Sequence, residues 1–310
     1  MALDPQARAI LDQMAEAGGP PINELSVNEA RQASAALTAM QGFPEPVGNV
    51  EDRMLPGPGG DIPVRIYVPC GKGPFPVLLY FHGGGWVIGD LESSDGLCRI
   101  LTNAVGCIVI SVDYRLAPEH PFPAAADDAY HATLWVAMNA SSFGGDPSRI
   151  AVCGDSAGGN LAAVVTQIAR DRGKPAICFQ LLIYPATDAA CDSPSYSENA
   201  QGYFLTKDAM QWFWNHYVRN SADRSHPYAS PLRARTLAGL PAALVITAEF
   251  DPLRDEGERY AEGLRAAGTP VQLIRYDGMI HGFFAMSAVI DQGRTAIQQS
   301  AAALRAALLK

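Results

Sequence analysis

The sequence predicts an α/β fold in which a mixed, mostly parallel sheet of about eight strands is flanked by helices. Along most of the chain, short and nearly continuous apolar segments alternate with helical ones. Strands that are apolar on both faces belong to a parallel sheet that is buried on both sides. Ahead of them, two strand-like segments flank the turn Gly57-Pro58-Gly59-Gly60 and are expected to pair as an antiparallel hairpin, which makes the sheet mixed.

From about residue 77 onward the expected strands are short and nearly continuously apolar, and helical stretches lie between most of them. A chain of 310 residues is long enough to bury such a sheet in one large domain. In chain order the expected strands are Val50–Leu55, Ile62–Val68, Val77–Phe81, Cys107–Val112, Ile150–Cys153, Phe179–Tyr184, Ala243–Thr247 and Val271–Ile274.

Two short helices are expected before the first strand. Asp4-Pro5 supplies an N-cap and a first-turn proline, and a Gly/Pro run at 18–21 ends the first helix. The capping box Ser26-x-x-Glu29 begins the second helix, which is expected to reach about Met40. Later helices are expected over about Asp95–Asn103, Ala124–Asn139, Ala157–Asp171, Asp255–Ala267 and Arg294–Leu308.

One segment, roughly Ala190–Pro231, interrupts the alternation of strands and helices. It is rich in aromatic residues and contains no obvious strand. Together with the N-terminal helices it could form a lid above the strand ends, although aromatic residues at this spacing also suit a core. We therefore expect N-terminal cap helices over residues 1–45, a cap insertion over 190–231, and a sheet domain over 46–189 and 232–310.

Composition and charge exclude several functional classes. The net charge is −9, and no Lys/Arg cluster interrupts it, so nucleic acid is not an expected partner. No run of about 18 apolar residues could span a membrane, and the first residues lack the features of a signal peptide. The six cysteines have no metal-ligand spacing, so we expect no metal and reduced thiols in a cytoplasmic protein. The expected state is a monomer or a homodimer.

The hexapeptide Gly154-Asp-Ser-Ala-Gly-Gly159 contains the Gly-x-Ser-x-Gly spacing of a nucleophile elbow. A serine at the tip of a tight strand-to-helix turn needs neighbours without a Cβ, which explains Gly154 and Gly158. An expected strand precedes the motif and an expected helix follows it. Ser156 is therefore a candidate nucleophile, and a flexible glycine-rich surface loop is the alternative.

A serine nucleophile needs a base and an acid, which in this arrangement follow it in the chain. Of six histidines, only His281 comes after the last expected strand, so it is the candidate base. The acid should follow the strand Ala243–Thr247, where Asp251 is the candidate. Asp251 could also be only the N-cap of the next helix, and the two roles are compatible.

Acyl transfer also needs N–H donors for the developing oxyanion. The run His82-Gly-Gly-Gly-Trp86 follows an expected strand, and the N–H groups of Gly83 and Gly84 could approach a substrate there. The N–H of Ala157, at the start of a helix, is the third candidate donor. A glycine-rich run can also hold phosphate, but no Lys-Ser/Thr follows it, which excludes a P-loop.

With these residues in place, the chain resembles the hormone-sensitive-lipase branch of the α/β-hydrolases, in particular its bacterial carboxylesterases. The resemblance implies Ser156, Asp251 and His281 as a catalytic triad, an eight-stranded sheet with a helical cap, no cofactor, and short- to medium-chain acyl esters as substrates. The matching segments are His82–Trp86, Asp113–Glu119, Gly154–Gly159, Tyr184-Pro185, Asp251–Asp255 and His281–Phe283.

The resemblance likewise implies Gly83, Gly84 and Ala157 as the oxyanion hole. Walls of the substrate pocket are expected from Trp86, Met210, Phe213 and Trp214. Two other functions share this fold or chemistry: a non-catalytic receptor for a small ligand, and a hydrolase of amides or thioesters. The first is disfavoured by the presence of His281, because receptors of this kind have lost that histidine.

Overall fold

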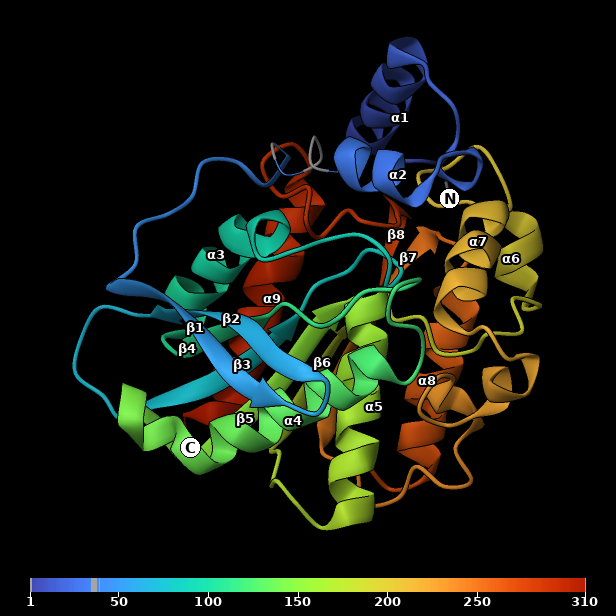
Figure 1. Ribbon diagram of the computed structural model, residues 1–310. Helices are drawn as coiled ribbons and strands as arrows, with labels where there is room; N and C mark the ends of the chain where they lie inside the picture. The colour runs from blue at the N-terminus through green and yellow to red at the C-terminus, as the bar shows by residue number, and fades with distance from the viewer. Residues whose placement is uncertain (1, 35–37, 39, 310) are drawn as a thin grey trace.

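The computed structural model describes residues 2–34, 38 and 40–309. Its centre is one eight-stranded sheet with the strand order β1-β2-β4-β3-β5-β6-β7-β8, flanked by helices (Figure 1). The strands are β1 (Asn49–Gly57), β2 (Gly60–Val68), β3 (Phe75–Phe81), β4 (Ile108–Val112), β5 (Gly145–Asp155), β6 (Phe179–Ile183), β7 (Ala242–Phe250) and β8 (Val271–Ile280).

Strand pairing confirms the mixed, mostly parallel sheet. β1 and β2 form the expected antiparallel hairpin, and β2 also pairs antiparallel with β4. The strands β4, β3, β5, β6, β7 and β8 are mutually parallel. The carboxyl ends of these parallel strands therefore lie along one edge of the sheet, which is where α/β proteins assemble their sites.

Several strands are longer than the sequence predicts, and β5 and β8 differ most from their expected ranges. β8 continues past Ile274 to Ile280, although Arg275, Asp277 and Gly278 break its apolar run. It lies at the edge of the sheet and pairs with β7 alone, so part of it is exposed and its pattern is mixed. β5 begins at Gly145 rather than Ile150, because its first residues are polar and partly exposed.

The expected N-terminal helices form with their expected caps. The carboxylate of Asp4 accepts hydrogen bonds from the N–H groups of Gln6 and Ala7, at 2.8 and 3.4 Å. Ser26 and Glu29 form the capping box, in which Ser26 N–H donates to Glu29 Oε2 at 2.9 Å. The second helix is described over Val27–Ser34, and its expected extension toward residue 40 falls partly on 35–37 and 39, outside the described residues.

The remaining helices follow the predicted order. The segment 190–231 contains short helices and, as expected, contributes no described strand. The α-helices are α1 (Pro5–Ala17), α2 (Val27–Ser34), α3 (Asp95–Val105), α4 (Ala124–Asn139), α5 (Ala157–Arg172), α6 (Pro194–Glu198), α7 (Lys207–Tyr217), α8 (Arg254–Ala266) and α9 (Asp291–Leu308); the 3₁₀ turns are η1 (Ile22–Glu24), η3 (Glu92–Ser94), η4 (Ala140–Phe143), η5 (Ser221–Ser225) and η6 (Pro231–Arg233).

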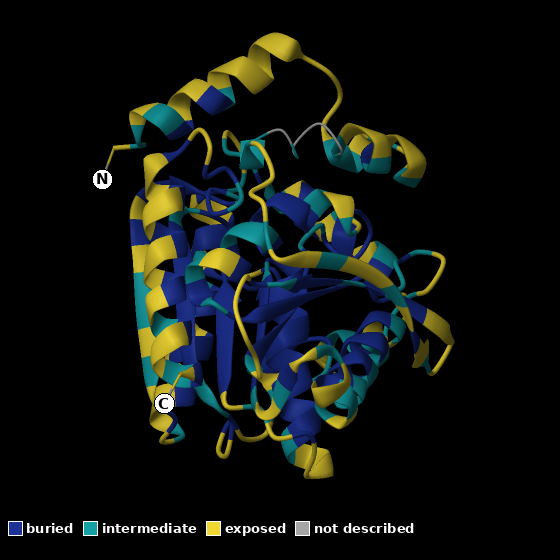
Figure 2. Ribbon diagram, turned by 90° about the vertical axis from the view of Figure 1, so that its left-hand side faces the viewer, coloured by how far each residue is buried: buried dark blue, intermediate teal, exposed yellow. Residues whose placement is uncertain are grey.

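The hydrophobic core lies in two layers, one on each face of the sheet. Alternate residues of β3 point to opposite faces: Val77, Leu79 and Phe81 join the layer under α4, α5 and α8, whereas Leu78 and Tyr80 join the layer under α3 and α9. Figure 2 shows the buried strands between these helices. Burial on both faces is the reason why the central strands are continuously apolar.

The N-terminal helices and the segment that holds α6 and α7 lie toward the carboxyl ends of the parallel strands (Figure 1). Arg31 in α2 makes a two-pronged ion pair with Glu119, with N–O distances of 2.8 and 2.7 Å. The same guanidinium donates to the carbonyl oxygens of Val87 and Ala117, at 2.9 and 3.1 Å. α2 is thereby fixed to the loops that follow β3 and β4.

Two further sequence expectations concern the cysteines and membranes. Cys98, Cys107, Cys153 and Cys191 are buried thiols, and burial raises the pKa of each. Within the described part of the chain, no group of acidic, histidine and cysteine side chains could hold a metal ion. None of the helices that the structure describes has both the length and the apolar character needed to cross a bilayer.

The central position of β3 predicts a large effect of truncating its side chains. Leu79 is 0% exposed, so Leu79→Ala is expected to lower the free energy of unfolding by about 2–5 kcal/mol through lost burial and a cavity. Leu309 is 50% exposed, and Leu309→Ala is the matched control, with an expected change within about 0.5 kcal/mol. Denaturant unfolding measures both; equal losses would contradict this description of the core.

Candidate active site

Ser156 lies at a strained turn between β5 and α5. Its backbone has φ 57° and ψ −115°, a conformation that residues other than glycine rarely adopt. A Cβ atom at Gly158 would lie 1.8 Å from the carbonyl oxygen of Phe81, and one at Gly154 would lie 2.2 Å from that of Gly158. Both glycines are therefore required by direct backbone contact, and the turn presents the serine hydroxyl beyond the end of β5.

The structure brings Ser156, His281 and Asp251 together in one hydrogen-bonded series. His281 Nε2 lies 3.0 Å from Ser156 Oγ, and His281 Nδ1 lies 2.7 Å from Asp251 Oδ2. All three residues are buried, with exposed fractions of 8% for Ser156, 6% for His281 and 0% for Asp251. An imidazole between a hydroxyl and a carboxylate is the arrangement that lets a histidine take a proton from a serine.

Each of these residues follows a different parallel strand. Ser156 comes directly after β5, Asp251 directly after β7 and His281 directly after β8. Because β8 extends to Ile280, which the sequence does not predict, His281 lies at the same edge of the sheet as Ser156 and Asp251. Asp251 also caps the turn before α8, because its Oδ1 accepts the N–H of Leu253 at 2.8 Å. The N-cap of α8 is Leu253 rather than Asp251, so the expected N-cap role of Asp251 is replaced by this hydrogen bond within the turn, and its role as the acid stays a prediction.

Gly83, expected from the sequence as an oxyanion donor, makes a different contact. Its N–H donates to Asp155 Oδ1 at 2.9 Å, and the hydroxyl of Tyr80 donates to the same oxygen at 2.5 Å. Burial raises the pKa of the Asp155 carboxyl, and the Tyr80 hydrogen bond acts in the opposite direction. The N–H of Gly83 is therefore already bonded to the carboxylate that precedes Ser156.

The next donors along the loop remain open. Gly84 and Gly85 have φ angles of 108° and 57°, which only glycine adopts without strain. Within the described part of the chain, neither of their N–H groups donates a hydrogen bond to another protein atom. Ala157 is the first residue of α5, so its N–H belongs to the group that has no partner inside the helix.

The four expected pocket-wall residues are all buried. Trp86 and Trp214 are 0% exposed and pack on each other with ring centroids 4.3 Å apart, and Trp86 also stacks on Tyr217 at 4.3 Å. Phe213 lies against the loop after β3, since a Cβ atom at Gly85 would be 2.1 Å from its ring. Met210 is 2% exposed. Packing between α7 and the loop after β3 accounts for the two tryptophans, and contact with substrate stays a prediction.

Two further buried groups, Tyr184 and Glu256, lie near the site, and the residue pattern alone does not indicate a function for them. The ring of Tyr184 lies 4.4 Å from the ring of His281. Glu256 is buried in α8, where its Oε1 accepts the N–H groups of Thr187 and Asp188 at 2.6 and 3.3 Å. Burial raises the pKa of the Glu256 carboxyl. The Tyr184-Pro185 pair of the family resemblance was the only sequence signal that pointed to this loop.

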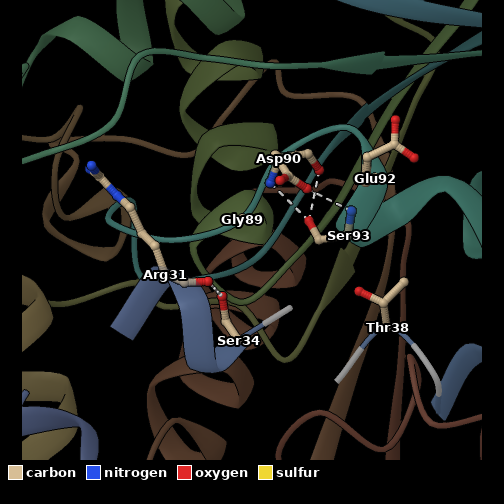
Figure 3. Close-up of a pocket in the computed structure, with 7 residues that line it drawn as sticks. All are labelled: Arg31, Ser34, Thr38, Gly89, Asp90, Glu92 and Ser93. Atoms are coloured by element: carbon tan, nitrogen blue, oxygen red, sulfur yellow. Dashed lines mark hydrogen bonds between the residues drawn. The ribbon is translucent and has the colours of Figure 1, made fainter. Parts of the chain in front are cut away.

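A separate cavity of about 130 Å³ lies between α2 and the loop that precedes α3 (Figure 3). Most of its lining residues have polar side chains, and Asp90 and Ser93 are hydrogen-bonded to each other within it, with Ser93 N–H donating to Asp90 Oδ1 at 2.7 Å. None of the sequence-predicted site residues lines it. The cavity is lined by Arg31, Ser34, Thr38, Gly89, Asp90, Glu92 and Ser93.

A serine on a nucleophile elbow, a histidine within hydrogen-bond reach and a buried aspartate behind it define a class of protein, the serine hydrolases. Each group lies after a parallel strand of an α/β sheet, in the chain order Ser, Asp, His. That order and the elbow are typical of the α/β-hydrolase fold.

Comparison with known proteins gives the particular family. Residues 78–285 match a family described as alpha/beta hydrolase fold. The carboxylic ester hydrolase LipN of Mycobacterium tuberculosis is 44% identical, over 99% of this chain and 83% of that protein. An ethyl acetate hydrolase of Pseudomonas putida is 39% identical, over 94% of this chain and 95% of that protein.

Solved structures agree with this result. A hyperthermophilic esterase from the archaeon Pyrobaculum calidifontis has a TM-score of 0.94 at 45% identity, and the match covers 99% of both chains. The chain therefore belongs to the α/β-hydrolase family, in the hormone-sensitive-lipase-like branch that contains bacterial carboxylesterases. It is a carboxylesterase.

The close approach at the elbow predicts that Gly158→Ala is severe. The added methyl group would overlap the Phe81 carbonyl oxygen, so we expect a loss of more than about 2 kcal/mol of stability and loss of activity. Gly202, at φ 85° with no atom near its Cβ position, is the control, and Gly202→Ala should cost about 1 kcal/mol through backbone strain alone. Thermal unfolding of both variants measures the difference; equal shifts would refute the contact argument.

Proposed function

We propose that Ser156, His281 and Asp251 are the catalytic triad of this esterase. Ser156 Oγ attacks the ester carbonyl carbon while His281 Nε2 accepts its proton, and Asp251 stabilises the resulting imidazolium. His281 then protonates the departing alcohol. Water, activated by the same imidazole, hydrolyses the acyl-enzyme and releases the acid. The observation that carries the proposal is the pair of hydrogen bonds of His281, at 3.0 Å to Ser156 and 2.7 Å to Asp251.

The tetrahedral oxyanion is bound by N–H groups of Gly84, Gly85 and Ala157. Gly83 is replaced in this role because its N–H is bonded to Asp155. Its part is instead to tie the oxyanion loop to the residue next to the nucleophile. Each oxyanion donor contributes on the order of 3–4 kcal/mol to lowering the barrier.

The substrates are short- to medium-chain acyl esters. This size range is supported by the burial of Ser156 and by the packing of α7 on the oxyanion loop, where Phe213 lies against Gly85. Residues 1–45 and 190–231 act as the cap over the site, within a sheet domain formed by 46–189 and 232–310. The similarity to a protein named as an ethyl acetate hydrolase favours small esters as well.

The charge and the thiols of the enzyme support proposals about its cellular compartment and its partners. It is a cytoplasmic monomer or homodimer that acts on small-molecule esters and has no nucleic-acid partner. The net charge of −9 and the buried thiols support these assignments. Amides and thioesters would pass through the same acyl-enzyme, so the preference for esters is a matter of relative rates.

The nucleophile is tested by Ser156→Ala. We expect kcat on p-nitrophenyl butyrate to fall by about 10⁴–10⁶-fold with the fold intact, because the other groups of the triad act only through the serine. A fluorophosphonate should label the wild-type protein at one equivalent and leave the variant unlabelled. Ser141, exposed in η4, gives the matched control Ser141→Ala; near-native turnover of Ser156→Ala would exclude the proposal.

Acyl preference is tested with a panel of p-nitrophenyl esters from acetate to palmitate. We expect kcat/KM to be highest among acetate, butyrate and octanoate and to fall steeply for palmitate, because the buried site leaves little room for a long chain. The corresponding anilide should react far more slowly. A maximum at palmitate, with activity appearing only above its solubility limit, would indicate a lipase instead.

A further inference from the structure

Helix α6 lies against the loop that carries Asp251. Ser195 is 0% exposed, and its Oγ donates to the carbonyl oxygen of Pro252 at 2.6 Å. The same Oγ accepts the N–H of Asp255 at 3.2 Å, and the N–H of Ser195 donates to Asp255 Oδ2 at 2.8 Å. Three hydrogen bonds thus join one residue of α6 to the turn after β7 and to the first turn of α8.

Asn199, directly after α6, continues this contact to Asp251 itself. Its Nδ2 donates to the carbonyl oxygen of Asp251 at 3.2 Å and to that of Glu249 at 3.4 Å. Asn199 is 3% exposed, so water has little access to replace these bonds. The two carbonyl groups flank Phe250, the last residue of β7. The Asn199 amide therefore bridges the last residues of β7 and the first residue of the following turn.

This contact completes the restraint on Asp251. Its side chain is held by Leu253 N–H on one oxygen and by His281 on the other. Its backbone carbonyl oxygen accepts the N–H of Arg254 at 3.2 Å and the Asn199 amide at 3.2 Å, so loss of the amide leaves one donor on this carbonyl and lets the carboxylate shift with it. Misplacement of a catalytic group by about 1 Å can lower a rate by about 10²-fold. Asn199 suits this role because a neutral amide donates to carbonyls without placing a charge beside the buried carboxylate.

We propose that Asn199, assisted by Ser195, is a positioning residue that fixes the backbone of Asp251 so that its carboxylate meets His281. The inference rests on the triad assigned under the proposed function. With this role, the segment 190–231 both covers the site as part of the cap and positions the catalytic groups. Its α7 packs on the oxyanion loop through Phe213, while α6 and Asn199 fix the acid, so one segment sets the geometry of both halves of the site.

The first test compares Asn199→Ala and Asn199→Asp with the wild type. We expect kcat to fall by about 10–100-fold while KM changes less than about threefold, because Asn199 touches neither substrate nor reacting atoms. Glu198→Gln is the matched control on the same helix. It removes an ion pair with Arg254 in which the Glu198 side chain is 56% exposed, and it should change kcat by less than about twofold.

A spectroscopic readout separates positioning from general destabilisation. The low-field proton resonance of the His281 Nδ1–H, which reports its bond to Asp251, should shift or broaden in Asn199→Ala and stay unchanged in Glu198→Gln. Folding of each variant is checked by circular dichroism and thermal unfolding. Should Asn199→Ala not fold, Ser195→Ala is the second variant, with a smaller loss of kcat expected in the same direction. Unchanged kcat and an unchanged resonance in a folded variant would overturn the proposal.

A double-mutant cycle with Asp251→Asn decides whether Asn199 acts through the acid. If it does, Asn199→Ala causes no further loss in the Asp251→Asn background, because there is no longer a carboxylate to position. An equal loss of kcat in both backgrounds would overturn the proposal. If Asp251→Asn alone leaves kcat near that of the wild type, the triad assignment fails instead, and the two failures are thereby distinguished.

Discussion

The imidazole of His281 must reach two groups at once, and the rest of the architecture meets this requirement. Ser156 lies 3.0 Å from one ring nitrogen and Asp251 2.7 Å from the other. These residues are 125 and 30 positions away from His281 in the chain, so no local structure can bring them together. The parallel sheet does so, because it ends β5, β7 and β8 along one edge. Burial then keeps water from competing for the hydrogen bonds of the three side chains.

The sequence predicts those parts of the fold and the site in which a residue pattern fits only one local structure. Central strands that are apolar on both faces belong to a parallel sheet that is covered on both sides. The glycines of the elbow are required because a Cβ atom there would overlap backbone atoms of Phe81 or Gly158. Edge strand β8 was harder. Its polar residues at 275, 277 and 278 broke the apolar run, and its pairing with β7 became visible only in three dimensions. The extension matters because it places His281 directly after the end of β8.

Two contacts of the site, those of Gly83 and Asn199, cannot be predicted from the sequence. In a run of three glycines no side chain distinguishes one N–H from the next, and what distinguishes Gly83 is the Asp155 carboxylate, 72 positions away. Asn199 is an ordinary polar residue in the sequence, and its role depends on a carbonyl group 52 positions away. In both cases the deciding contact joins a side chain to a distant backbone group, for which neither periodicity nor spacing leaves a pattern.

The central claim is that one site combines the serine, the histidine, the aspartate and the N–H donors. The most direct measurement is a crystal structure of the enzyme inactivated by a phosphonate ester, whose tetrahedral phosphorus mimics the reaction intermediate. We expect phosphorus bonded to Ser156 Oγ, its anionic oxygen within hydrogen-bond distance of the N–H groups of Gly84, Gly85 and Ala157, and His281 still bonded to Asp251. A phosphonate on another residue, or an oxygen bound away from these N–H groups, would contradict the account.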